Sequence, residues 1–315
     1  MDHQRLAQST DRAIAAGPVL LLSVDYEDWH QLVRRRYGDP GWSEPGPALA
    51  RQTQTILELF DELGVRCTFF ILGVTARAHP DLVRRIAAAG HEIGSHGDAH
   101  APVWRQTATE FADDLRRATA TIEQLTGQRP RGYRAPAFSI TSAAGWAYDV
   151  IAAEGFEYDA SQSPAPSLRS ATGSASRGPY ERGAGVLWEF PVAASRWRSV
   201  CMPLGGASYW SVAPTRVVLA GLRRVPPLSG LYLHPQEFDP EPLDPLLGRA
   251  NGAAGRARIR ARTWQRNAAR SRAVPVLRAI AKRHDLISYG EAHARLVQNR
   301  AAGARPLPFQ GTPVR

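Results

Sequence analysis

Hydrophobic positions along the chain form short apolar runs that alternate with stretches of helical spacing. Val19–Val24 is a nearly continuous apolar run, which is typical of a strand covered on both faces. From Ala48 to Leu63 apolar residues recur at helical spacing, and Gly64 follows as the expected helix cap. The same alternation continues through strands at Val65–Leu72, His91–Gly94, Gly132–Arg134 and Phe156–Tyr158, and through helices at Asp81–Ala89, Thr109–Leu125 and Ala143–Glu154. It predicts an α/β fold with helices outside a parallel sheet, either a barrel or a doubly wound sheet.

Beyond residue 160 the pattern becomes less regular. Residues 161–185 are rich in Ser, Pro, Gly and Ala and predict a long irregular loop. Strands are then expected at Val186–Val192, Leu231–Leu233 and Leu286–Ser288, and helices at Ala273–Lys282 and Glu291–Asn299. We find no internal repeat and no clean linker. We therefore expect a single domain over residues 17–299, with an N-terminal extension at 1–16 and a disordered tail at 300–315.

The composition agrees with a globular protein. The chain has 315 residues, of which 43% are hydrophobic and 22% charged, and this excludes disordered and fibrous proteins. The net charge of +10 comes almost entirely from arginine, since Lys282 is the only lysine, and we attribute it to codon bias in a GC-rich genome. The stretch Arg249–Arg272, which contains Trp264, is expected to form a solvated or substrate-facing helix. We expect no nucleic-acid partner.

Three features lead us to expect a cytoplasmic protein without a transmembrane segment. Cys67 and Cys201 are too few for a disulfide framework. No stretch approaches the roughly 18 apolar residues that a membrane span needs. The apolar segment Ala13–Val24 has no cleavage site after it and runs directly into an acidic cluster, so a first core strand explains it better than a secretion signal.

Polar residues follow several of the expected strands. They are Asp25, Glu27 and Asp28 after the first strand, His96 and His100 further on, then Arg134 and His234. In a parallel α/β barrel the carboxyl ends of the strands form the active site. Two histidines and a carboxylate suit a zinc ion that keeps one position open for water. A His-x3-His pair alone is equally typical of a solvated or capping role, but carboxylates this close together repel one another in a site without a cation.

Two of these residues predict proton chemistry. Arg134 lies between Tyr133 and Pro136 at a strand end, and we interpret it as the partner of a buried carboxylate. His234 closes an apolar run and is followed by Pro235, which fits a positioned acid or base.

Taken together, these segments resemble the polysaccharide deacetylase family, also called the NodB-homology group or carbohydrate esterase family 4. The matching segments are SVDYED (23–28), TFFILG (68–73), HEIGSHGDAH (91–100), GYRAPAFSI (132–140), FEYDAS (156–161), EFP (189–191) and LHPQEFD (233–239). They occur in the family's order, and the first is closest to the branch with an Asp-x-Glu-Asp motif. The resemblance implies a distorted, incomplete (β/α) barrel of about seven strands.

The resemblance also implies roles for individual residues. Asp25 corresponds to the general base and Arg134 to the arginine that pairs with it. His234 corresponds to the general acid, with Asp159 as the residue that orients it. The implied metal ligands are Glu27, His96 and His100, with Asp28 as the alternative to Glu27. On the substrate side, the backbone N–H near Ala137 corresponds to the oxyanion donor, and Phe138 stands beside it in place of the aromatic residue that many members carry one position earlier.

The implied function is a metal-dependent hydrolase that removes an N-acetyl or other N-acyl group from a sugar. The substrate is expected to be an N-acylated saccharide in a polysaccharide, a glycan precursor, or a lipid- or nucleotide-linked form, and a lipid-linked substrate would imply peripheral membrane contact. One divalent metal ion is expected, Zn²⁺ first and Co²⁺, Ni²⁺ or Mn²⁺ after it. Two alternatives stay open: hydrolysis of a non-sugar C–N bond in a cyclic amide or formamide, and a carbohydrate-binding relative without turnover.

Overall fold

Seven parallel strands lie side by side at the centre of the molecule. The computed structural model describes residues 17–163, 180–182, 187–197, 200–210, 213–244, 252–270 and 272–302. The parallel strands, in spatial order, are β10 (Ser229–Leu233), β1 (Leu20–Tyr26), β2 (Thr68–Ile71), β3 (Glu92–Ser95), β4 (Gly132–Tyr133), β5 (Tyr158–Asp159) and β7 (Leu187–Glu189). The predicted (β/α) order of about seven strands is therefore confirmed, and it belongs to one domain.

Two backbone hydrogen bonds join the ends of this row of strands. Just beyond β7, the Ala193 N–H donates to the Gly230 oxygen at 2.8 Å, and the Gly230 N–H donates to the Pro191 oxygen at 2.9 Å. We call this contact the seam of the barrel. Because it consists of two hydrogen bonds and not of a continuous pairing between two strands, the barrel is distorted and incomplete, as expected. Four further short strands complete the described β structure. Strand β6 (Tyr180–Arg182) is antiparallel to β7, and β11 (Leu286–Ile287) lies beside the start of β1. Strands β8 (Ala194–Trp197) and β9 (Val200–Pro203) form a separate hairpin.

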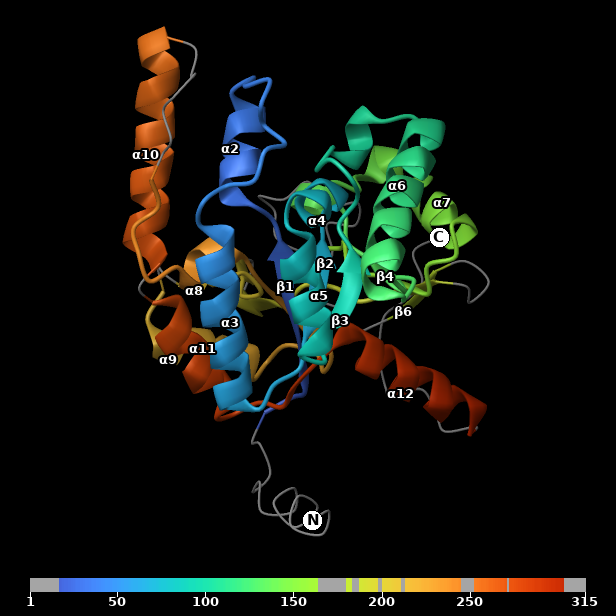
Figure 1. Ribbon diagram of the computed structural model, residues 1–315. Coiled ribbons are helices and arrows are strands. Elements are labelled where there is room, and N and C mark those ends of the chain that lie inside the picture. Colours follow the sequence, from blue (N-terminus) through green and yellow to red (C-terminus); the bar gives the residue numbers. More distant parts are fainter. Residues whose placement is uncertain are drawn as a thin grey trace.

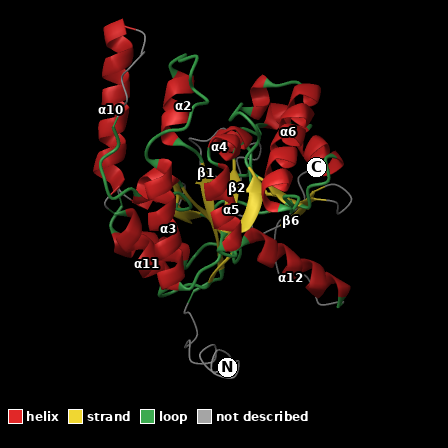
Figure 2. Cartoon of the chain, in the orientation of Figure 1, coloured by secondary structure: helices red, strands yellow, loops and turns green. Residues whose placement is uncertain are grey.

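Helices cover the outside of the sheet, as Figure 2 shows. They are α2 (Trp29–Arg36), α3 (Leu49–Leu63), α4 (Gly73–Ala78), α5 (Pro80–Ala88), α6 (Ala108–Thr126), α7 (Ala147–Ala153), α8 (Ala207–Trp210), α9 (Thr215–Leu222), α10 (Gly252–Arg270), α11 (Ala273–Ala281) and α12 (Tyr289–Ala301). Short 3-10 turns η1 (Val103–Arg105), η2 (Pro136–Phe138), η3 (Ser142–Ala144) and η4 (Pro235–Phe238) lie between them. None of the described helices is both long enough and apolar enough to cross a membrane.

The apolar faces predicted from the sequence form the core. Helix α3 buries Ile56 and Phe60 against Phe69 of β2, whose ring lies 6.2 Å from that of Phe60. Burying side chains of this size contributes about 1.5–3 kcal/mol each. The helix ends at Gly64, which has a φ of 62°, a left-handed conformation that glycine adopts without a steric cost.

Several elements differ from the prediction. Helices α2, α4, α8 and α9 and the hairpin β8–β9 were not predicted, because each of these elements is no more than eight residues long. The predicted helix Ala143–Glu154 is divided, since η3 precedes Gly145 and α7 begins only at Ala147. The predicted extension 1–16, most of the loop 161–185 and nearly all of the tail lie outside the described residues.

Helices α2 and α10 stand together above the carboxyl ends of the strands (Figure 1). Trp29 and Val33 of α2 form an apolar cluster with Ile259 of α10. The arginine-rich stretch therefore forms a helix, as expected, and it packs through this small apolar face while Trp264 is 73% exposed. Both helices reach the edge of the sheet at which the predicted site residues lie.

Candidate metal centre and active site

The carboxyl ends of β1 and β3 bring two histidines and a carboxylate to one point. Glu27 follows β1 directly, His96 follows β3, and His100 lies in the turn beyond. Glu27 Oε1 lies 3.0 Å from His96 Nε2 and 2.9 Å from His100 Nε2. One ligand atom from each residue lies within 4.8 Å of the other two. The structure thus assembles the three residues that the sequence suggested as metal ligands.

The surroundings of His96 fit a metal ligand. Its Nδ1 lies 2.8 Å from the backbone oxygen of Arg134, and a hydrogen bond there assigns the ring proton to Nδ1. A neutral ring then directs the lone pair of Nε2 toward Glu27, so two acceptors face each other 3.0 Å apart. A cation between them removes this repulsion, and a carbonyl on the far ring nitrogen is the usual outer partner of a metal-bound histidine. The donor set suits a divalent ion such as Zn²⁺.

Backbone conformation and charge both prepare this centre. His100 has a φ of 54°, a left-handed conformation that costs a non-glycine residue about 1–3 kcal/mol. Burial disfavours a charge on Glu27, but the positive charge of His100 and the hydrogen bond from His100 hold the pKa of Glu27 well below its usual value. The Glu27 carboxyl group is therefore ionised, as a metal ligand has to be.

Asp28, the alternative ligand, is directed away from this centre. Its Oδ1 accepts the backbone N–H of His30 at 2.9 Å and caps α2, while its Oδ2 accepts from the Gly46 N–H at 2.7 Å and lies 3.0 Å from His79 Nε2. Burial opposes its ionisation, but the hydrogen bonds from His30, His79 and Gly46 lower the pKa of Asp28. The geometry therefore supports Glu27 as the metal ligand, and Asp28 stabilises the start of α2.

Asp25 is held by a completely buried arginine, Arg134. The Arg134 Nη1 donates to Asp25 Oδ1 and to Ser23 Oγ, both at 2.6 Å. Its Nε donates to the Ala160 oxygen at 3.1 Å, and its Nη2 donates to the Tyr289 hydroxyl at 2.7 Å. Arg134 is 0% exposed, so the ion pair is screened little by water and its geometry is fixed from four sides. The predicted pairing of Asp25 with Arg134 is present in the structure.

The sequence did not point to Ser23 or Tyr289. Ser23 lies inside the apolar run of β1, where a single polar residue looks incidental, although its hydroxyl donates to the Leu231 oxygen at 2.9 Å. Tyr289 lies two positions after β11, which pairs in parallel with β1. Its position just beyond a strand was the only feature of the sequence that could have indicated a place near Asp25. The pairing of these two distant strands was needed to recognise it.

His234 follows β10 and is accompanied by Glu237 in the 3-10 turn that comes next. The His234 backbone N–H donates to Glu237 Oε2 at 2.9 Å, and His234 Nδ1 lies 3.6 Å from Glu237 Oε1. Burial would lower the pKa of His234, but the Glu237 carboxylate raises it, with Glu27 and Asp25 contributing, to about 9. The His234 ring is therefore charged at neutral pH and can donate a proton.

The prediction that Asp159 orients His234 is wrong. The Asp159 carboxylate accepts hydrogen bonds from the Ser161 hydroxyl at 2.6 Å and from the Ser161 N–H at 2.9 Å. In the sheet, residue Asp159 of β5 lies opposite residue Glu189 of β7. Burial and the neighbouring Asp159 raise the pKa of Glu189 well above its usual value, so the two carboxyl groups share a proton. Glu237, three positions after the histidine, occupies the place that we had assigned to Asp159.

Ala137 lies in an exposed, strained turn beside these groups. Ala137 and Phe138 have φ angles of 52° and 51°, which are unusual for residues with a Cβ atom. The Ala137 N–H has no acceptor among the described residues. The Phe138 ring is buried against Tyr232, with ring centroids 4.9 Å apart. A strained turn with an unused N–H fits the predicted oxyanion donor.

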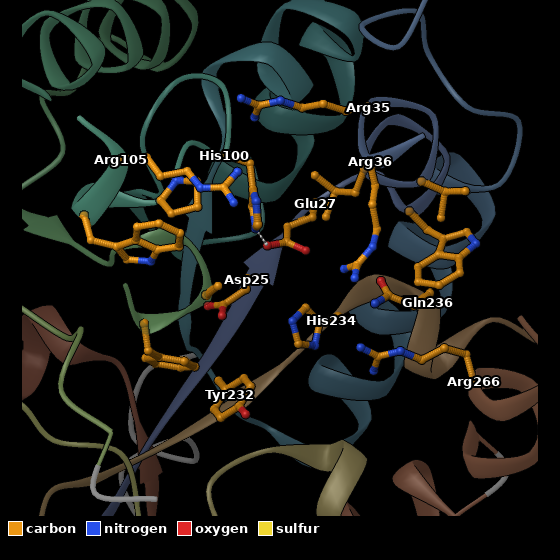
Figure 3. A pocket seen from close by; sticks show the side chains of 17 residues that line it. Asp25, Glu27, Arg35, Arg36, His100, Arg105, Tyr232, His234, Gln236 and Arg266 are labelled. Atoms are coloured by element: carbon orange, nitrogen blue, oxygen red, sulfur yellow. Dashed lines mark ion pairs between the residues drawn. The ribbon is translucent and has the colours of Figure 1, made fainter. Parts of the chain in front are cut away.

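Six of the residues described above line one cleft of about 790 Å³, which Figure 3 shows from close by: Asp25, Glu27, His100, Ala137, Phe138 and His234. Asp25, Glu27 and His100 lie near its centre with His234. The other lining residues are Trp29, Leu32, Val33, Arg35, Arg36, Pro102, Trp104, Arg105, Tyr232, Gln236 and Arg266. The cleft is large enough for a sugar with a substituent.

Comparison with known proteins finds family models that match two segments of the chain. A family model described as polysaccharide deacetylase matches residues 39–152, which include His96, His100 and Arg134. Residues 39–152 of this chain are thus similar to the polysaccharide deacetylase family. A second model, described as a domain of unknown function (DUF3473), matches residues 160–284, which include His234 and Glu237. Both matched segments contribute strands to one sheet, with β2, β3 and β4 from the first segment and β7 and β10 from the second.

Curated members of the polysaccharide deacetylase family resemble part of the chain. The peptidoglycan deacetylase of Helicobacter pylori is 31% identical over 104 residues, which are 33% of this chain and 34% of that protein. The chitooligosaccharide deacetylase of Bradyrhizobium sp. is 32% identical over 130 residues, which are 38% of this chain and 55% of that protein. The chain thus matches between a third and just over half of the length of these two relatives.

Two solved structures share the fold. A candidate polysaccharide deacetylase from Mycobacterium smegmatis has a TM-score of 0.60 at 20% identity, covering 96% of this chain and 97% of that one. An allantoinase, PuuE, has a TM-score of 0.54 at 18% identity, covering 89% and 90%. At these identities the likeness concerns the fold alone.

Proposed function

We propose that this protein is a metal-dependent hydrolase that removes an N-acetyl or other N-acyl group from a sugar. The observation that carries the proposal is the meeting of three assemblies in one cleft. They are the Glu27–His96–His100 donor set, the Asp25–Arg134 pair and the His234–Glu237 pair. The names of the curated relatives, which act on peptidoglycan and chitooligosaccharides, support a sugar as the substrate. The cytoplasmic location stays a prediction.

Glu27, His96 and His100 would hold the metal ion, with Zn²⁺ as the first candidate. A divalent ion supplies a Lewis acid that polarises the amide carbonyl and makes water more acidic. The chain itself fixes the donor atoms: the Arg134 carbonyl orients His96, and the left-handed turn at His100 brings the second imidazole within 2.9 Å of Glu27.

Asp25 is placed to accept the proton of the attacking water. Arg134 binds one carboxylate oxygen of Asp25 and thereby fixes the direction of the other. Because Arg134 is also held by Ser23 and Tyr289, the base keeps its orientation without any rearrangement during the reaction. Substrate binding has only to bring the amide carbon to this preformed arrangement.

His234 is placed to protonate the leaving amine. Glu237 keeps the imidazole charged and holds the ring beside the cleft, where it can donate its proton as the C–N bond breaks. The Ala137 N–H is available for the oxygen of the amide when that atom becomes negative. Proton acceptor, proton donor and oxyanion donor are thus all supplied by this chain.

The test is a paired measurement on the His96→Ala variant. The unchanged protein is expected to contain about one equivalent of divalent metal and to release amine from N-acetylated sugars, and the variant is expected to lose both. The control is His293→Gln, which removes an imidazole on α12 that lies beside Glu157, 3.2 Å away.

A fully active His96→Ala protein would rule out the proposal. Metal content without amine release from any saccharide would favour a cyclic amide or formamide substrate, or a binding protein without turnover. Thermal unfolding of both variants shows whether each one is folded.

A further inference from the structure

Four arginines from three separate elements surround the mouth of the cleft. Arg35 and Arg36 lie in the last turn of α2, Arg105 lies at the end of η1, and Arg266 comes from α10. Figure 3 shows them on several sides of Glu27 and His234. These elements are far apart in the sequence, so the fold gathers the four guanidinium groups at this point.

Three of these arginines form no ion pair with an acidic residue in the described part of the chain. No ion pair joins Arg35, Arg36 or Arg105 to a described carboxylate, although many other arginines are paired in this way, such as Arg51 with Asp239 at 2.8 Å. Arg105 instead lies over the Trp104 ring, 4.7 Å from its centroid. The high arginine content alone does not explain a cluster of three arginines without an ion pair among the described residues.

Arg35 shows most directly that the unpaired guanidinium groups are destabilising. Its Nη1 atom is buried without a hydrogen-bond partner among the described residues, and its guanidinium lies 4.9 Å from the centroid of the Trp42 ring. Burial lowers the pKa of Arg35 from its usual value although the charge of Asp114 opposes the change, so the charged form of Arg35 is poorly solvated. A buried donor without an acceptor is destabilising, and a bound oxyanion would relieve it.

The acidic groups in the cleft do not neutralise this surface. Among the described lining residues only Asp25 and Glu27 are acidic. Asp25 is already paired with Arg134, and Glu27 is already bound by His96 and His100. Arg266 is the best engaged of the four arginines, since it donates to Ser208 Oγ at 2.8 Å and lies 3.9 Å from Glu237. The cleft therefore has a surplus of positive charge at its mouth.

We propose that the substrate is an N-acylated sugar carrying a phosphate or diphosphate group, which Arg35, Arg36 and Arg105 bind. This proposal rests on the proposed function and names its substrate class. Each guanidinium has five N–H donors in a planar fork that matches phosphate oxygens, and one carboxylate offers too few lone pairs for three such groups. The 48% exposed Trp104 adds an aromatic surface on which a sugar or base can stack.

Binding without turnover tests the proposal. Protein freed of metal by dialysis is titrated calorimetrically with N-acetylglucosamine, N-acetylglucosamine 1-phosphate and UDP-N-acetylglucosamine. We expect the phosphate-bearing sugars to bind at least ~10-fold more tightly than the neutral sugar. The Arg36→Gln/Arg105→Gln variant is expected to lose this preference. Arg84→Gln, which removes an exposed arginine paired with Asp81 on α5, is expected to keep it.

Three outcomes would overturn the proposal. One is equal binding of neutral and phosphate-bearing sugars. A second is an equal loss in Arg84→Gln and in the cleft variant, which would indicate a general charge effect. Arginine-dependent binding of a uronic acid oligosaccharide as tight as that of the nucleotide sugar would also contradict the phosphate assignment.

A farnesyl diphosphate-linked N-acetylglucosamine, compared with the nucleotide sugar, shows whether the phosphate belongs to a lipid or a nucleotide carrier. Both results support the proposal. Because the titrations need neither metal nor turnover, they remain informative if amine release is never observed, and a failed titration leaves the hydrolase proposal standing. Thermal unfolding of each variant confirms that the protein is folded.

Discussion

At the scale of single residues, the protonation of His234 depends chiefly on one neighbour, Glu237. Burial alone would lower the pKa of this imidazole, and the Glu237 carboxylate 3.6 Å away reverses the effect and raises the pKa to about 9. Because the folded-state pKa lies above the ordinary value, the charged form and the stability it contributes are fully present at neutral pH. Both are lost as the pH rises through about 9.

Glu237→Gln is therefore expected to move the alkaline limb of the kcat profile to lower pH. Without the carboxylate, burial favours neutral His234, so kcat at pH 8 should fall ~10-fold or more while metal content is unchanged. The pH dependence of amine release measures the shift. Asp159→Asn is the matched control, because Asp159 contacts Ser161 rather than His234. A shifted limb in the control and an unmoved limb in Glu237→Gln would contradict this assignment.

The same residues show what a sequence can predict. His96, His100, Arg134 and His234 follow strands, and parallel strands bring their carboxyl ends to one edge, so their meeting was predictable. The partner of His234 was not, because the position of Glu237 depends on the 3-10 turn that follows β10.

At the scale of elements, helix α2 shapes the cleft and is anchored by Asp28. The Asp28 carboxylate caps the helix and also binds the Gly46 N–H and His79, and the helix carries Trp29, Arg35 and other lining residues. Trp29, Leu32 and Val33 have helical spacing, but the helix is only eight residues long, too short for this pattern to predict it. Its packing against α10 through Trp29 and Val33 supplies the stability that helix propensity does not.

Asp28→Ala and Glu27→Ala are expected to affect different properties of the protein, stability in the first case and metal content in the second. Asp28→Ala removes an N-cap and should lower the free energy of unfolding by about 1–2 kcal/mol while the protein keeps its metal. Glu27→Ala should lose the metal. Urea denaturation and metal analysis of both variants separate the two roles. Loss of metal from Asp28→Ala, with retention in Glu27→Ala, would show that the ligand assignment is wrong.

At the scale of the whole molecule, the barrel seam and the active site meet at Gly230. Gly230 makes both backbone hydrogen bonds to the segment after β7, and a Cβ atom there would collide with the Tyr289 hydroxyl that binds Arg134. The seam joins β7 to β10, and Tyr289 joins α12 to the buried arginine. Seven alternating strands were predictable from the sequence, but the contact that joins the ends of the row was not, since it depends on how the whole sheet curves.

Gly230→Ala is expected to affect stability and turnover together. The added methyl group should lower the free energy of unfolding by about 1–3 kcal/mol through overpacking. Displacement of Tyr289 should also reduce kcat, because the orientation of Asp25 depends on Arg134. Gly255→Ala on α10 is the control, since its Cβ would meet nothing within 4 Å. A Gly230→Ala protein as stable and as active as the unchanged protein would refute this coupling.

The most direct test of the central claim measures metal content and amine release on the same purified protein, before and after chelation. With a panel of N-acetylated sugars, sugar phosphates and oligosaccharides, we predict about one equivalent of divalent metal and amine release that stops on chelation and returns with the metal. Amine release that persists in metal-free protein, or a protein that binds no metal at all, would contradict the account.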